Sequence, residues 1–177
     1  MKKFGTTFLM VCSILLTLLG CQKKTDYIIE YSTTGCFGDC PVLDMKLVEN
    51  ELYYNFIKHN EQKGIFHSSL SKEQEEAVNS LISSILNEDI KEEYLGDVVD
   101  VPATYFKLYR GNDELIKTNY DDYLAPKLLD SLYSYLLGIS EDNLTRLEFD
   151  TINFSTRKEI GIETFTPPPP PKKDNDE

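Results

Sequence analysis

Hydrophobic and polar positions alternate along the first part of the chain, and this pattern predicts a run of β-strands. In residues 42–48 the apolar residues fall on every second position, which is the period of a half-buried strand. Aromatic and β-branched residues at 27–31, 52–57 and 65–68 favour strands as well. The polar turn at 49–51 predicts that the second and third of these strands form a hairpin.

The period changes to three and four residues in two later stretches, which predicts two amphipathic helices. Ser71 and Gln74 have the spacing of a capping box and precede an apolar stripe at 77–86. Pro126 suits the first turn of the second helix, which carries a stripe of leucines at 128–137.

A second hairpin is predicted at 104–118, between the two helices, because its two strand-like halves flank Gly-Asn-Asp. The predicted order is therefore β-β-β-β-α-β-β-α over a single domain at 27–138. This order is typical of an α+β fold with a small antiparallel sheet and two helices packed on one face. Residues 139–166 are expected to form a C-terminal extension, either as an edge strand or as a segment packed against the domain.

Residues 1–20 have the pattern of a secretory signal peptide. Their apolar run at 8–19 follows two lysines and is shorter than the roughly 20 residues that a spanning helix needs. Residues 18–21 read Leu-Leu-Gly-Cys, the pattern of a lipobox. We expect Cys21 to be acylated, with palmitate among its chains, and residues 21–26 to act as a spacer; the alternative is an ordinary signal peptide with a chance cysteine.

The charge of the chain excludes one class of partner. The formal net charge is −12, and nucleic acid binding needs clustered lysines and arginines. Residues 167–177 begin with five prolines and end in charged residues, a composition typical of a disordered tail. We expect a protein held by lipid at Cys21 on the periplasmic side of the outer membrane, with a protein partner of the cell envelope, no nucleic acid partner and no cofactor.

Two of the four cysteines are left for the folded domain, since Cys12 lies in the signal and Cys21 is expected to be acylated. Cys36 and Cys40 are separated by three residues, and exported proteins form and retain disulfides. A structural disulfide is the favoured interpretation. A redox-active pair or a metal site remain as alternatives, the metal site with His59 and His67 as further ligands.

The loop that carries these cysteines reads Thr-Gly-Cys-Phe-Gly-Asp-Cys-Pro at 34–41. It precedes an alternating strand, a hairpin and a capped helix. This arrangement resembles a family of uncharacterised bacterial envelope proteins, a domain of unknown function with many lipoprotein members, marked by a Cys-Phe-Gly-x-Cys-Pro loop. The resemblance covers 27–138; it implies a compact domain in which Cys36 and Cys40 act together, and it implies no activity.

Other polar clusters give weaker signals. Asp121 and Asp122 precede the second helix and suit the entry loop and cap of that helix, with a cation site or a general acid and base pair as the alternatives. The acidic stretch at 92–100 is typical of solvated surface, with weak calcium binding as the alternative. Because the sequence shows no nucleophile elbow and only two histidines, we expect a noncatalytic binding domain, with a thiol-disulfide or metal-binding activity as the alternative.

Overall fold

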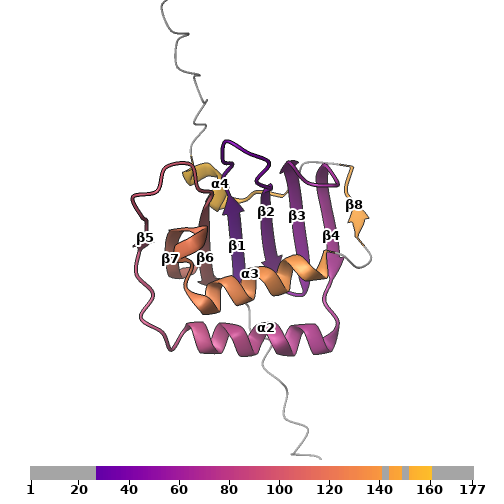
Figure 1. Ribbon diagram of the computed structural model, residues 1–177. Coiled ribbons are helices and arrows are strands. Elements are labelled where there is room, and N and C mark those ends of the chain that lie inside the picture. Colours follow the sequence, from indigo (N-terminus) through magenta and orange to yellow (C-terminus); the bar gives the residue numbers. More distant parts are fainter. Residues whose placement is uncertain (1–26, 141–143, 149–151, 161–177) are drawn as a thin grey trace, which may run out of the picture.

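The structure is a computed structural model that describes residues 27–140, 144–148 and 152–160. Its strands form one sheet of eight in the order β5-β7-β6-β1-β2-β3-β4-β8 (Figure 1). All neighbouring strands are antiparallel except β5, which runs parallel to β7. The strands are β1 (Tyr27–Thr33), β2 (Val42–Val48), β3 (Glu51–Lys58), β4 (Gly64–Ser69), β5 (Glu93–Tyr94), β6 (Ala103–Arg110), β7 (Asp113–Asp121) and β8 (Thr145–Arg146).

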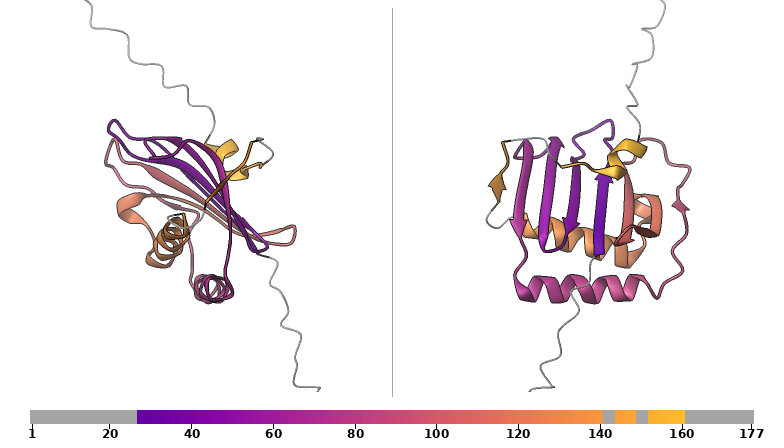
Figure 2. Two further views of the ribbon diagram at one scale, coloured as in Figure 1. Left: turned by 90° about the vertical axis from the view of Figure 1, so that its right-hand side faces the viewer. Right: turned by 180° about the vertical axis from the view of Figure 1, so that it is seen from behind.

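Helices lie on both faces of the sheet (Figure 2). The two long helices, α2 (Lys72–Ile85) and α3 (Lys127–Ile139), share one face, and the short helix α4 (Ser155–Glu159) lies on the other. A 3-10 turn, η1 (Asp122–Leu124), joins β7 to α3. The sheet is therefore the middle layer of three, although the outer layer with α4 is small.

The predicted α+β class is confirmed, but the predicted order of elements and the packing of two helices on one face only are wrong. The described chain adds β5, α4 and β8 to this order, of which β8 is an edge strand within the expected C-terminal extension at 139–166, and the parallel pairing of β5 makes the sheet mixed rather than antiparallel. The two added strands have two residues each, too few to show any hydrophobic period. Helix α4 has five residues, so its formation depends on contacts with the sheet rather than on its own sequence.

The capping box predicted at the start of α2 is confirmed. The backbone N–H of Gln74 donates to Ser71 Oγ at 3.3 Å, and the Ser71 N–H donates to Gln74 Oε1 at 2.8 Å. Helix α3 begins after Pro126, which stands at its N-cap. The local signals in the sequence therefore fix where both long helices begin.

The apolar core lies between the sheet and the two long helices. It contains side chains that are almost inaccessible to solvent, from the central strands (Ile29, Tyr31, Met45, Leu52, Tyr54, Phe106 and Leu108) and from the two helices (Ile82, Leu129, Leu132 and Leu136). Two buried tyrosines also bind α3 by hydrogen bonds, because the Tyr31 and Tyr54 hydroxyls donate to the carbonyls of Leu129 at 3.0 Å and Leu136 at 2.7 Å. These bonds satisfy polar groups that burial would otherwise leave unpaired.

No helix within the described ranges is long and apolar enough to cross a membrane. The expected signal peptide, the expected lipid site at Cys21 and the proline-rich tail lie outside the described residues.

Candidate functional site

The loop between β1 and β2 carries the cysteine pair at one end of the sheet. Cys36 Sγ and Cys40 Sγ are joined at 1.95 Å, and the two Cα atoms lie 5.6 Å apart. The sequence prediction that these cysteines meet agrees with this geometry. Both cysteines are half-buried, and Gly38 donates its N–H to Cys36 Sγ at 3.3 Å. The disulfide therefore closes a small turn at the surface rather than cross-linking the core.

The same loop is held against the loop that precedes β6. Thr34 donates its N–H to the Ala103 carbonyl at 2.8 Å, and Ala103 donates its N–H to Thr34 Oγ1 at 2.8 Å. Nearer the tip, the Phe37 N–H donates to Asp100 Oδ1. Asp100 has a positive φ of 76°, which is uncommon for a residue with a side chain. Hydrogen bonds and a covalent link together fix this end of the sheet.

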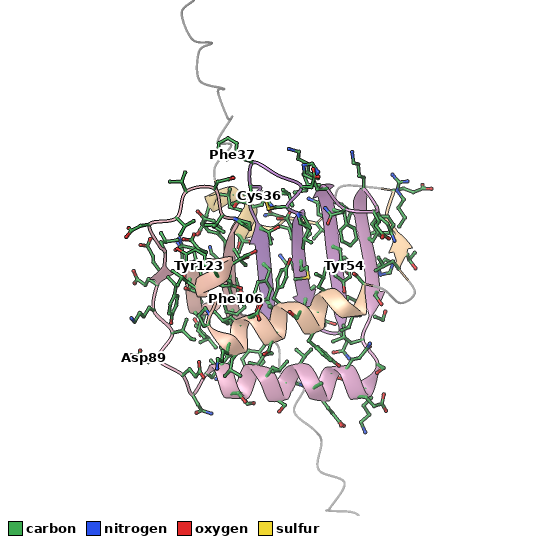
Figure 3. All side chains as sticks on the ribbon, in the orientation of Figure 1. Cys36, Phe37, Tyr54, Asp89, Phe106 and Tyr123 are labelled. Atoms are coloured by element: carbon green, nitrogen blue, oxygen red, sulfur yellow. A yellow bond between two sulfur atoms is a disulfide. The ribbon has the colours of Figure 1, made fainter. Side chains whose placement is uncertain are left out.

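Apolar side chains project from these two joined loops. Phe37 is 76% exposed and points away from the fold (Figure 3). Val98 and Val99 of the neighbouring loop are 55% and 84% exposed. We call Phe37, Val98 and Val99 the apolar tip. Because Asp100 binds the backbone of Phe37, the tip brings together segments about sixty residues apart in the sequence.

The two histidines lie at opposite ends of β3 and do not form one site with the cysteines. His59 follows β3 and lies beside the disulfide loop, with its Nδ1 3.2 Å from Asp39 Oδ1. His67 on β4 pairs with Glu51 at the start of β3, at 3.3 Å. Within the described ranges no group of three or more His, Cys, Asp or Glu side chains is placed to hold a metal ion.

Asp121 and Asp122 make bonds within the protein. Asp121 ends β7, is 7% exposed, and accepts the Gly96 N–H at 2.8 Å. Asp122 begins η1 and accepts a hydrogen bond from Thr104 Oγ1 at 3.2 Å. The first bond ties the acidic stretch at 92–100 to the sheet. Neither residue caps α3, whose N-cap is Pro126 with no side-chain hydrogen bond.

The sheet face opposite the two long helices holds a buried polar network that the sequence prediction missed. Asp44 is fully buried and accepts hydrogen bonds from Ser32 at 2.6 Å, Asn55 at 2.9 Å and Arg157 Nε at 2.8 Å. Arg157 also donates to the carbonyls of Thr33 and Leu43, at 2.9 and 3.2 Å. Arg157 thereby fixes α4 against β1 and β2.

A second part of this network centres on Glu30 of β1, which is 2% exposed. One carboxylate oxygen accepts the N–H groups of Ser155 at 2.6 Å and Thr156 at 3.2 Å, and the other lies 2.8 Å from Lys46 Nζ. Burial by itself would raise the pKa of Glu30, but the hydrogen bonds from Lys46 and Ser155 outweigh burial and hold the pKa below its usual value. A carboxylate on the sheet therefore caps the first turn of α4.

The described residues form an α+β protein with a disulfide-closed loop at one end of the sheet and a buried polar network on the face opposite the long helices. The chain belongs to DUF6438, a domain of unknown function, and the sequence model of this family matches residues 27–140. No curated protein matches the chain. The family match ends before the 152–160 segment that covers the polar face.

Sequence reasoning identified the cysteine loop but not the apolar tip. The signal was present in Val98 and Val99, two adjacent apolar residues inside an otherwise acidic stretch. The interpretation of 92–100 as solvated surface gave these two valines no role. Their proximity to Phe37 depends on hydrogen bonds between distant loops, which no local pattern shows.

Proposed function

We propose that this chain is a lipid-anchored protein of the bacterial cell envelope, whose DUF6438 domain binds a partner protein without catalysis. The apolar tip is the observation that carries the binding role. Three exposed apolar side chains lie on two loops that the bond between Phe37 and Asp100 joins, and exposed apolar patches mark interaction sites more often than isolated apolar residues do. The disulfide and the bond to Asp100 hold Phe37 in place before binding, which lowers the entropic cost of association.

The position of the N-terminal end of the domain supports this arrangement. Tyr27 begins β1 at the end of the sheet opposite the disulfide loop (Figure 1). Cys21 precedes Tyr27 by six residues, a distance of at most about 20 Å when fully extended. A lipid at Cys21 would therefore hold one end of the domain at the membrane and direct the apolar tip away from it, toward a protein partner.

The lipid anchor is tested by Cys21→Ser, with Cys12→Ser as the matched control. Cells expressing the full chain are fed an alkyne analogue of palmitate, and the protein is then fractionated. We expect Cys21→Ser to lose the label and to leave the membrane fraction, whereas Cys12→Ser keeps both. Retention of the label by Cys21→Ser would contradict the anchor.

The binding role is tested by placing a photo-crosslinking amino acid at Phe37 of the full chain in living cells. The control position is Lys72, whose side chain is 72% exposed at the start of α2. We expect position 37 to yield one discrete adduct with an envelope protein that position 72 does not yield. Val99→Ser should reduce this adduct several-fold. Equal adduct patterns at the two positions, or no adduct from position 37, would contradict the proposal.

A thiol-disulfide role for Cys36 and Cys40 is the second candidate, and the hydrogen bond from Gly38 to Cys36 Sγ favours it. A donor at this sulfur stabilises the thiolate form. The reduction potential separates the two functions, because a structural disulfide has a potential below about −300 mV, whereas a catalytic one is more oxidising. Phe37→Ser should abolish partner binding and leave this potential unchanged.

A further inference from the structure

The outer edge of β7 is open along its first part. On this side β5 pairs only with Asn119 and Tyr120. The carbonyl of Glu92 accepts the Asn119 N–H at 3.0 Å, and no strand within the described ranges pairs with the outer side of 113–118. In Figure 1 the chain that leads from α2 to β5 runs outside β7. This edge resembles the open strand edges that other chains can extend.

The backbone of Lys117 faces this open side. Consecutive residues of a strand present their N–H and C=O groups to opposite sides, so residues two apart face the same side. The Asn119 N–H points away from β6 toward Glu92, and Lys117 lies two positions before it in the same strand. The N–H and C=O of Lys117 are therefore directed outward, where a further strand would bind.

A groove lies along this edge, between β7 and the segment before β5. Its volume is about 510 Å³, within the roughly 300–1,000 Å³ of ligand-binding pockets. Apolar residues contribute to its lining and three glutamates surround them: Ile90, Leu115 and Ile116, with Glu92, Glu93 and Glu114. Lys107 pairs with Glu114 at 3.4 Å and Lys117 pairs with Glu159 at 3.0 Å, so Glu92 and Glu93 supply the negative charge that a basic ligand would meet.

We propose that this groove binds an extended, basic segment of a partner protein, which adds to β7 as a further strand. Main-chain hydrogen bonds to the open edge would supply affinity, as in other cases of strand addition. Alternate side chains of a strand point to opposite faces, so the apolar residues of the segment contact Ile116, whose partner on β6 is the buried Leu108, while its basic residues meet the acidic side of the groove. Paired strands match residue for residue, so the open part of β7 at 113–118 accommodates a segment of about six residues, or about 20 Å at 3.3 Å per residue.

A second copy of this chain fits the groove less well than a basic segment does. Two chains of formal net charge −12 repel each other, and pairing of two β7 edges would bring Glu92 and Glu93 of both copies into the same interface. Like charges facing each other across an interface reduce affinity. The groove is also separate from the apolar tip, so its role depends neither on the lipid anchor nor on Phe37.

The test compares Lys117→Pro with Lys117→Ala in the full chain, solubilised in a neutral detergent. Both variants lose the lysine side chain, but only proline removes the outward N–H, and proline is tolerated at strand edges. The probe is a six-residue peptide of alternating lysine and valine with blocked ends, titrated against the amide NMR signals of the protein. We expect shifts at Leu115 and Lys117 in the native chain, and binding by Lys117→Pro at least tenfold weaker than by Lys117→Ala.

Charge and backbone are then tested separately. Glu92→Gln with Glu93→Gln should weaken the probe several-fold, and a probe with glutamate in place of lysine should not bind. If Lys117→Pro fails to fold, a probe with methylated backbone nitrogens replaces it and should lose binding to the native chain. Equal binding by Lys117→Pro and Lys117→Ala, full binding of the methylated probe, or dimerisation of the free protein through β7 would overturn the proposal. The variant Phe37→Ser should bind the probe normally, so failure at the apolar tip is distinguishable from failure here.

Discussion

The two faces of the sheet are buried by opposite chemistry, although the same strands build both. Toward α2 and α3, β1 and β2 present Ile29, Tyr31 and Met45, which are fully buried among apolar side chains. Toward α4, the neighbouring positions hold Glu30 and Asp44, which are 2% and 0% exposed and lie in hydrogen bonds and ion pairs. The face toward α2 and α3 gains stability because folding removes its apolar surface from water. On the face toward α4, the cost of burying charged groups is offset only while each group keeps its hydrogen-bond or ion-pair partner.

The largest expected loss of stability comes from the apolar face. Phe106 on β6 is fully buried, and its ring centroid lies 4.7 Å from that of Tyr31. Phe106→Ala should reduce the free energy of unfolding by about 3–5 kcal/mol, because it removes buried area and leaves a cavity. Urea unfolding of the full chain measures this loss.

The same substitution at the apolar tip is the control. Phe37→Ala removes a ring that is 76% exposed and should change stability by less than about 0.5 kcal/mol. Similar losses at the two positions would show that the apolar face is not the main source of stability.

On the polar face the largest effect should come from Asp44→Ala, at about 3 kcal/mol. This change leaves Ser32, Asn55 and Arg157 without their shared acceptor, and breaking a buried ion pair costs about 3–5 kcal/mol. The expected loss is at the lower end because the Arg157 side chain is 27% exposed and can turn toward water. Urea unfolding again measures it.

A double-mutant cycle with Arg157→Ala isolates the ion pair. If the pair acts as a unit, the double variant loses less stability than the sum of the single losses, by about 1 kcal/mol or more. Strict additivity would show that α4 is held to the sheet by something other than Asp44 and Arg157.

The pH dependence of stability should also come from the polar face. The pKa of Glu30 lies below its usual value in the folded protein, so the unfolded state binds the proton more tightly. The stabilisation by ionised Glu30 is therefore complete above the unfolded pKa of about 4.3 and is lost as the pH falls through the lower, folded pKa.

Glu30→Gln should lower stability at pH 7 by about 2 kcal/mol, since it removes charge-assisted hydrogen bonds to Ser155 and Lys46. The difference between native chain and variant should shrink as the pH falls from 5 to 3. Urea unfolding across this range provides the measurement, and a difference that stays constant with pH would contradict the role of Glu30.

The comparison also shows which parts of this fold can be predicted from sequence. The strand at 42–48 and the two helices were predictable because their apolar residues repeat with the period of the element. The same rule failed for Asp44 and Lys46, because a polar residue at every second position indicates a solvent-exposed face. Here that face is covered by residues 152–160, whose side chains become partners only after the chain returns to the sheet.

The candidate site also has a part that the sequence predicts and a part that it does not. Cys36 and Cys40 were predictable as a pair from their spacing and from the expected compartment. The apolar tip was not, because it depends on the hydrogen bond between Phe37 and Asp100, two residues on different loops. The open edge of β7 was also hidden, since it results from a two-residue strand that ends early.

The apolar face also contains a hydrogen bond that can be removed without changing the packing around it. Tyr54→Phe keeps the buried ring and removes only the hydroxyl that donates to the Leu136 carbonyl at 2.7 Å. The free energy of unfolding should fall by about 1 kcal/mol, which is typical for the loss of a neutral hydrogen bond. The Leu136 carbonyl that accepts this bond remains part of α3 in the variant. Tyr123→Phe, at a side chain that is 51% exposed, is the control and should be within about 0.5 kcal/mol of the native chain. If Tyr54→Phe instead matched the loss from Asp44→Ala, hydrogen bonds would contribute equally on both faces, and the contrast between an apolar and a polar side of this sheet would fail.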